Sequence, residues 1–170
     1  MSVTSIRRER REDLEAIREV NRLAFGQDAE ARLVDRLRAD GLLVASLVAV
    51  EGHQTIGHIL FSELPIETDS AVIRGAALAP MSVVPSRQRE GIGSSLVREG
   101  LAECRSRGVA VVLVLGHLDF YPRFGFSVEK ARCLRSKYAG PHFMALELVP
   151  GVLDGVVGTV TYPPAFSEVD

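Results

Sequence analysis

Two stretches near the start of the chain carry apolar residues at helical spacing. Within residues 12–25, apolar side chains recur every three or four residues, at Leu14, Ile17, Val20 and Ala24. Charged side chains occupy many of the positions between them. This spacing predicts an amphipathic helix. Residues 28–38 repeat the pattern and Gly41 follows them, which is typical of a helix C-terminus, so we expect a second, shorter helix there.

The pattern changes to that of β-strands in the middle of the chain. Residues 43–51 and 55–63 flank the turn formed by residues 52–54, which predicts a β-hairpin. A third strand is expected over residues 76–84, with Pro80 in its middle. Because proline has no N–H group to donate to a sheet, Pro80 predicts a bulge or a place where this strand leaves its neighbour.

A strand–loop–helix–strand unit follows. The loop of residues 86–93 contains two glycines, a helix is expected from about Ile92 to Arg107, and residues 109–115 are all apolar, which is typical of a strand buried on both faces. Together with the third strand, these elements predict a right-handed βαβ crossover. The remaining candidate elements complete a mixed α/β sheet; they are a strand at residues 3–8, a short helix or turn at 119–124, and strands near 142–149 and 156–161.

Length and composition indicate one globular domain, which we expect to span residues 1–170. Hydrophobic residues make up 46% and charged residues 25% of the chain, which excludes disordered and collagen-like classes. No apolar stretch approaches the roughly 20 residues that cross a bilayer, and charges precede any apolar segment, so we expect neither a membrane span nor a signal peptide. Cys104 and Cys133 are too few for a disulfide framework and lack metal-ligand spacing, so we expect a cytoplasmic protein without a metal site.

The overall charge argues against nucleic acid or an anionic membrane as a partner. The chain has 20 basic and 22 acidic side chains, a formal net charge of −2. The arginine-rich start of the chain is matched by carboxylates over residues 7–40, which indicates a solvated, self-neutralised face rather than a nucleic-acid-binding arm.

The loop before the third predicted helix carries candidate anion-binding chemistry. Residues 86–94 read SRQREGIGS; Gly91 and Gly93 allow backbone amides to approach an anion, and the helix N-terminus adds unpaired N–H groups. Arg87 and Arg89 add local positive charge, so the loop predicts a diphosphate site. It is not a P-loop, because no Gly-Lys-Ser/Thr ending follows, and Leu96 stands where a dinucleotide fingerprint has its third glycine.

Two longer motifs resemble those of the GNAT superfamily of N-acetyltransferases. Residues 79–85 (APMSVVP) followed by Gln88-x-x-Gly91-x-Gly93 resemble its acetyl-CoA signature, and residues 120–126 (FYPRFGF) resemble the tyrosine-bearing helix and Gly-Phe ending after its fifth strand. The order of elements also agrees over nearly the whole chain. The resemblance implies the GNAT fold, a twisted mixed sheet flanked by helices, and direct transfer of an acetyl group from acetyl-CoA to a primary amine.

The same resemblance implies a division of the cosubstrate-binding residues. The pantetheine of acetyl-CoA would lie where two strands splay at Pro80 and pair with backbone groups of Met81, Ser82 and Val83. The diphosphate would lie on backbone amides of the loop and helix start; these residues are Gln88, Arg89, Glu90, Gly91, Ile92, Gly93 and Ser94. Arg87 or Arg89 would reach the nucleotide phosphates, with a solvated loop arginine as the alternative.

The catalytic candidates are Tyr121, His117 and Glu63. By its position in the motif, Tyr121 would donate to the departing thiolate, and the alternative is a tyrosine that only packs beneath the cosubstrate. His117 or Glu63 would remove the proton of the amine; an imidazole suits this task at neutral pH, and a chain of water molecules is the alternative. A backbone N–H beside the bulge would stabilise the oxyanion.

Other interpretations stay open at this point. A non-catalytic acyl-CoA-binding module or sensor would share the loop, and a generic nucleotide-binding α/β protein would bind ATP or NAD without preference for CoA. Small amines, antibiotics, amino acids and peptide amines are all open as acceptors. The oligomeric state is also open, with a homodimer formed through a strand at the C-terminal edge as one alternative.

Overall fold

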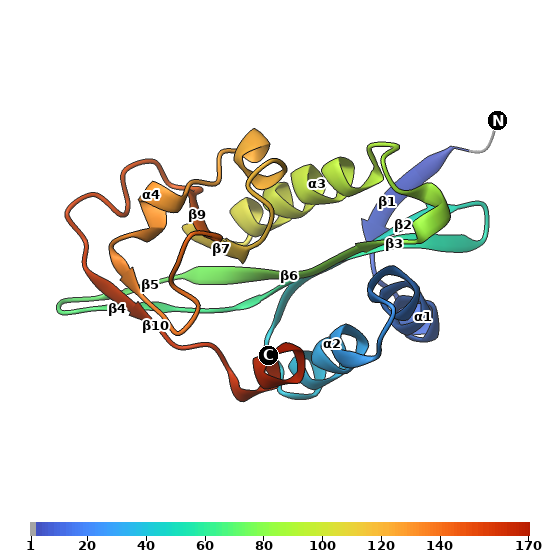
Figure 1. Cartoon of the computed structure of the whole chain (residues 1–170), viewed down its shortest axis with the longest axis horizontal. Coiled ribbons are helices and arrows are strands. Elements are labelled where there is room, and N and C mark those ends of the chain that lie inside the picture. The colour runs from blue at the N-terminus through green and yellow to red at the C-terminus, as the bar shows by residue number, and fades with distance from the viewer. Residues whose placement is uncertain (1–2) are drawn as a thin grey trace.

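The computed structural model describes residues 3–170, and its largest feature is a six-stranded mixed sheet with the order β1-β2-β3-β6-β7-β9 (Figure 1). The strands are β1 (Thr4–Arg8), β2 (Leu43–Glu51), β3 (Gln54–Glu63), β6 (Gly75–Val83), β7 (Val111–Leu115) and β9 (Phe143–Glu147). The pair β6–β7 is parallel and the other neighbours are antiparallel. The predicted hairpin is therefore confirmed as β2–β3.

Helices cover both faces of this sheet, α1 (Leu14–Phe25) and α2 (Ala29–Ala39) on one face and α3 (Ile92–Ser106) on the other (Figure 1). The three helices begin and end close to the residues that the apolar spacing predicts. The sheet separates two buried apolar clusters: Ile17 and Leu33 belong to the cluster beneath α1 and α2, and Phe61 and Leu96 belong to the cluster beneath α3. Burial of these faces is the main favourable term that holds the layers together.

The parallel pairing of β6 and β7, with α3 between them in the chain, confirms the predicted crossover. Val111–Leu115 is buried over four of its five residues, as expected of a strand covered on both faces. Gly100 lies where α3 crosses β3, and a Cβ at this position would come within 2.2 Å of Phe61 Cε2. The helix therefore lies unusually close to the sheet.

The expectation of one sheet is wrong in part. A second, four-stranded sheet has the order β5-β4-β10-β8 and is formed by β4 (Ile66–Thr68), β5 (Val72–Ile73), β8 (Leu134–Arg135) and β10 (Gly158–Val160). The strand expected near residues 156–161 is thus β10, which pairs with β4 and β8 and not with the main sheet. These strands are two or three residues long, too short for any periodicity to mark them.

Short helical segments complete the structure. They are the single-turn helix α4 (Val128–Ala131) and the 3₁₀ segments η1 (Arg11–Asp13), η2 (Pro85–Arg87), η3 (Tyr121–Phe124) and η4 (Pro164–Val169). η3 is the short helix or turn expected after β7, whereas α4 and η4 were not expected. Within residues 3–170, no helix has the length and apolar character that crossing a membrane requires.

Candidate active site

The strands β6 and β7 are paired only over their first residues. Gly75, Ala76 and Ala77 of β6 face Val111–Leu113, whereas β7 continues to pair with β9 as far as Leu115. The register between β3 and β6 shifts at the same place, because Phe61 faces Leu78 but Ile59 faces Met81. One extra residue therefore stands in β6 at Ala79–Pro80, which confirms the predicted bulge. Beyond it, the backbone edge of β6 that faces β7 has no strand partner among residues 3–170.

A cleft of about 900 Å³ opens at this splay. It is lined by β6 beyond the bulge, the following loop, the first turn of α3, the segment after β7, and the facing ends of α1 and α2. The site residues expected from the sequence that line it are Met81, Ser82, Val83, Gln88, Arg89, Gly91, Gly93, Ser94, His117 and Tyr121. Glu90, Ile92 and Glu63 do not line the cleft.

The N-terminus of α3 presents free backbone amides. The N–H of Ser95 donates to the carbonyl of Gly91 at 3.1 Å, and no side chain caps the helix, so the amides of Ile92, Gly93 and Ser94 have no partner within it. Arg89 and Gly91 both have left-handed backbone, with φ of 65° and 86°. A non-glycine residue in this region is uncommon, and left-handed residues beside a helix start turn successive N–H groups to one side. The local geometry is that of an anion-binding cradle.

The side chains of the loop have separate tasks. Gln88 donates from Nε2 to the carbonyl of Val83 at 2.9 Å, which ties the loop to the end of β6. Arg87 forms ion pairs with Glu51 at 2.8 Å and with Glu90 at 3.2 Å, so its charge is neutralised within the protein. Arg89 forms no ion pair with the residues that the structure describes, and it is the loop cation available to a ligand. Ile92 is buried in the core, so only its backbone amide can serve the cradle.

Tyr121 is enclosed by aromatic rings and by a glycine. Its ring lies edge-on to Phe120 and Phe126, with centroids 5.0 and 5.7 Å away. A Cβ on Gly116 would come within 2.4 Å of the Tyr121 ring, so only glycine allows this approach. Burial raises the pKa of the Tyr121 phenol to about 12, and the hydroxyl therefore stays protonated at neutral pH. Within residues 3–170 it has no hydrogen-bond partner, which leaves the phenol free to donate into the cleft that this residue lines.

The two candidate bases lie in different places. His117 is exposed and lines the cleft, and its carbonyl accepts the backbone N–H of Tyr121 at 3.2 Å, so one turn of chain holds both residues. Glu63 faces Ala76 at the start of β6 and forms an ion pair with Arg74 at 3.0 Å. Arg74 in turn donates to the carbonyl of Arg107 at the C-terminal end of α3. Glu63 is thus at the end of β6 and α3 opposite to the cradle.

Four further residues of the cleft are not among the site residues expected from the sequence. Arg123 lies over the ring of Phe120 at 5.7 Å, and Phe120 lies beside Gly93 of the cradle, which brings a second cation to the loop. On the other side of the sheet, Phe25, Glu30 and Val169 reach the same cleft from α1, α2 and η4. Arg123 lies within the FYPRFGF motif, so the sequence carries a signal for it, whereas the other three residues are brought together only by the fold.

Comparison with known proteins decides the family. The model of the family described as "Acetyltransferase (GNAT) domain" matches residues 5–128. The chain belongs to the GNAT family. Among its GNAT relatives are two proteins of Escherichia coli K12 described as uncharacterized N-acetyltransferases. YhbS is 35% identical over 150 residues, which is 86% of this chain and 89% of YhbS, and YjhQ is 41% identical over 118 residues, which is 67% of this chain and 64% of YjhQ.

Two crystal structures of GNAT proteins are similar over almost the whole chain. The structure of E. coli YhbS in complex with CoA has a TM-score of 0.89 and 34% identity, and covers 98% of this chain and 93% of its own. The structure of a GNAT acetyltransferase from Brucella melitensis in complex with acetyl-CoA has a TM-score of 0.79 and 39% identity. The match covers 96% of this chain and 98% of the Brucella chain. The expectations of a GNAT fold and of N-acetyltransferase activity are confirmed for this chain.

Proposed function

We propose that this protein transfers the acetyl group of acetyl-CoA directly to a primary amine of a small molecule or peptide. The observation that carries the proposal is the continuous path formed by the unpaired edge of β6, the amide cradle of α3 and the buried phenol of Tyr121. The CoA and acetyl-CoA complexes of YhbS and of the Brucella protein support the same donor here.

The cosubstrate would be held mainly by backbone. An extended pantetheine needs donors and acceptors of the kind that β6 offers beside Met81, Ser82 and Val83, where β7 has moved away. The paired phosphates suit the amides from Arg89 to Ser94, because the helix N-terminus carries partial positive charge, whereas the amide of Gln88 donates to the carbonyl of Pro85 at 3.5 Å. We assign Arg89, and not the neutralised Arg87, to the phosphates, together with Arg123.

Tyr121 would act as a hydrogen-bond donor to the sulfur that leaves. An ordinary thiol has a pKa of about 8.5, whereas burial raises the pKa of the Tyr121 phenol to about 12, so complete proton transfer to the thiolate would be unfavourable by roughly 5 kcal/mol. A hydrogen bond from the phenol stabilises the developing charge without this penalty. The thiolate then takes its proton from solvent as CoA departs.

The amine must lose a proton before or during attack, when the new C–N bond forms and the C–S bond breaks. We propose that His117 takes this proton from the amine, because it lines the cleft within one turn of Tyr121. Glu63 is set aside, since its carboxylate is paired with Arg74 at the opposite end of β6. A water chain to solvent is the competing route.

We further propose that residues 1–170 act as one domain in the cytoplasm. The segment beyond residue 128 supports this because β9 pairs with β7 and because Phe166 of η4 is buried with Leu33 and Leu37 of α2. Both cysteines are free thiols, and Cys104 is fully buried, which suits a reducing compartment.

The function is tested by thiol release and product mass with acetyl-CoA and a panel of primary amines, using the wild type and Tyr121→Phe. We expect acetylated amine, and we expect Tyr121→Phe to lower kcat by about 10- to 100-fold while KM for acetyl-CoA changes less than about twofold. Tyr162→Phe is the matched control, because the Tyr162 ring packs edge-on against Tyr138 and Phe166, the residue does not line the cleft, and loss of its hydroxyl should leave kcat unchanged.

Two outcomes would contradict the proposal. CoA binding without product from any amine would support the acyl-CoA-binding module instead. Unchanged turnover in Tyr121→Phe would retain the transfer reaction but remove the role assigned to Tyr121.

A further inference from the structure

The cleft continues past the splayed strands to an end that the cosubstrate residues do not use. We call this the distal end and define it by Phe25, Glu30, Leu33, Leu115 and Val169. Phe25 belongs to α1, and Glu30 and Leu33 belong to α2; these helices cover one face of the main sheet, whereas α3, which carries the amide cradle, covers the other (Figure 1). An acceptor that entered from this side would pass the exposed members of this set before it reached the splayed strands.

The wall of the distal end is apolar and open. Phe25, Leu115 and Val169 are 41%, 52% and 36% exposed, which places them among the most exposed large apolar side chains of residues 3–170, and they come from three different elements. Leu33 is buried and closes the floor. Exposed apolar side chains are normally scattered singly over a protein surface. Several of them gathered in a concave site with a polar rim therefore indicate a surface that binds a ligand.

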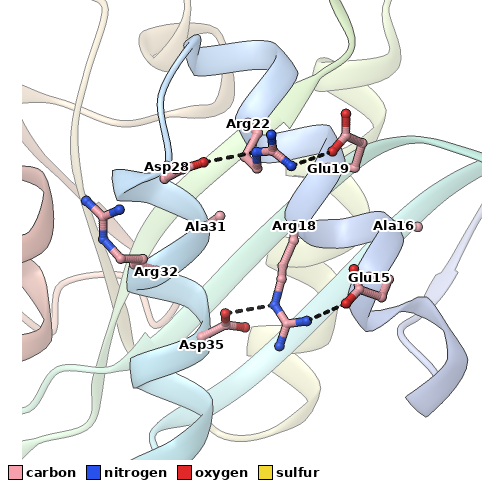
Figure 2. Close-up of a pocket in the computed structure, with 9 residues that line it drawn as sticks. All are labelled: Glu15, Ala16, Arg18, Glu19, Arg22, Asp28, Ala31, Arg32 and Asp35. Carbon is pink, nitrogen blue, oxygen red and sulfur yellow. Dashed lines mark hydrogen bonds and ion pairs between the residues drawn. The ribbon is translucent and has the colours of Figure 1, made fainter.

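Glu30 is unusual among the carboxylates of the two helices. Glu15 and Asp35 both bind Arg18, and Glu19 binds Arg22, as Figure 2 shows. Arg22 also holds Asp28 in the turn before α2 (Figure 2). Every other acidic side chain within α1 and α2 is therefore neutralised by an arginine, in keeping with the balanced charge of this region.

Glu30 has no such arginine among the described residues. Its two oxygens accept only the amide of Gln27, at 3.1 and 3.2 Å, and it lies half-buried in the first turn of α2, where the helix dipole favours a negative charge. A carboxylate without a cationic partner, set beside an apolar wall, is complementary to a cation that the protein itself does not supply.

We propose that the acceptor is a primary amine carried on an apolar aliphatic or aromatic chain. Its ammonium group is drawn to Glu30 on entry, and its chain lies against Phe25, Leu115 and Val169 while the amine moves to the thioester. Zwitterionic amino acids and polyhydroxylated amines fit poorly, because a carboxylate would face Glu30 and hydroxyl groups would lose water against apolar side chains. This inference rests on the proposed acetyl transfer.

The test compares n-alkylamines from ethylamine to hexylamine, together with 4-aminobutanol, which replaces the terminal methyl of pentylamine by a hydroxyl. We expect kcat/KM to rise about two- to fourfold for each added methylene and pentylamine to exceed 4-aminobutanol by at least about tenfold. Phe25→Ser should flatten the chain-length series and leave KM for acetyl-CoA unchanged.

Glu30→Gln tests the charge. We expect KM for pentylamine to rise roughly tenfold, with kcat and KM for acetyl-CoA within about twofold of the wild type. Glu19→Gln is the matched control, since that carboxylate is paired with Arg22 outside the cleft and its loss should change neither constant. A purely structural Glu30 would instead lower the melting temperature without this split between KM and kcat.

The two proposals fail in different ways. If 4-aminobutanol or glycine is acetylated as well as pentylamine, or if Glu30→Gln leaves KM for the amine unchanged, the inference about the acceptor is overturned and acetyl transfer stands. If no amine on the panel is acetylated although CoA binds, the proposed function fails and the inference fails with it.

Discussion

The position of Tyr121 depends on Gly116. The ring lies where any side chain on residue 116 would stand, and two further rings close around it. The same burial that fixes the ring also raises the pKa of the phenol to about 12, so position and protonation have one cause. The tyrosine is visible in the FYPRFGF motif, but its dependence on a glycine five residues earlier appears only in the folded chain.

His117 differs from Tyr121 in being exposed, so its role rests on place and chemistry alone. We expect His117→Gln to lower kcat about 100-fold and to change the dependence of kcat on pH, because the variant lacks the base that takes the proton of the amine. Rates measured from mildly acidic to alkaline pH, with saturating acetyl-CoA, give the comparison.

His53→Gln is the control for this experiment, because His53 is an exposed residue in the β2–β3 turn and is absent from the cleft. A His117→Gln variant with the wild-type rate and pH profile would exclude the histidine and favour the water chain.

α3 joins the cradle to the core. Its first turn supplies free amides, and its middle lies so close to β3 that Gly100 and the Phe61 ring occupy adjoining space. Ile92, Leu96 and Val97 are buried on the same helix, so the packing that fixes α3 also fixes the amides at its N-terminus. Stability and cosubstrate binding are therefore coupled in this element.

Gly100→Ala tests this close contact. Alanine is favoured over glycine in a helix by about 1 kcal/mol, but its Cβ would lie 2.2 Å from Phe61 Cε2. We expect overpacking to prevail and the free energy of unfolding to fall by about 1–3 kcal/mol, measured by urea denaturation. Glu99→Ala, at an exposed position one residue earlier, should stay within about 0.5 kcal/mol of the wild type. A more stable Gly100→Ala protein would show that α3 shifts without strain.

A polar network, buried at Asn21, Ser46 and His58, links five parts of the molecule. The ring of His58 on β3 contacts Asn21 of α1 at 3.2 Å and Ser46 of β2 at 3.0 Å, Ser46 donates to Glu9 after β1, and Arg38 of α2 binds Glu9 at 2.7 Å. Burial, with the nearby charge of Arg38, lowers the pKa of His58 to about 3, so the imidazole is neutral in the folded protein.

This polar network makes the stability of the protein depend on pH. His58 takes up a proton near pH 6.5 when unfolded but only near 3 when folded, so the unfolded state binds more protons between these values and stability falls as the pH is lowered. We expect a loss of up to about 1.4 kcal/mol per pH unit below about 6.5.

Urea denaturation between about pH 7 and 5 measures this loss. The lowered pKa values of Asp13 and Glu103 keep these carboxylates from contributing much above about pH 5. His58→Gln, which cannot titrate, should be less stable at neutral pH but lose this slope. Equal slopes in both proteins would assign the pH dependence to other groups.

The C-terminal edge of the main sheet is partly covered. Ser127 forms two backbone hydrogen bonds of 3.0 Å with Ala145 of β9, and Lys130 of α4 forms an ion pair of 2.6 Å with Glu147 of the same strand. A second copy that added a strand to β9 would have to avoid this contact. The homodimer stays a prediction. A molar mass from light scattering that is twice the mass of one chain would support it.

Local patterns in the sequence determined the three long helices, the hairpin, the crossover and the bulge, because an amphipathic period or a proline in a strand acts over neighbouring residues. The same holds for the cradle, since glycines and a helix N-terminus need no distant partner to bind an anion. The second sheet escaped prediction because its strands are two or three residues long and pair across large separations in the chain.

Tertiary structure alone decided which of the candidate groups share the site. It neutralised Arg87 with Glu51, moved Glu63 to the far end of β6, and brought Phe25, Glu30 and Val169 to one cleft. Each of these outcomes depends on distances between residues far apart in the chain. Residue type and spacing describe what a side chain can do, but the packing of layers determines which side chains meet.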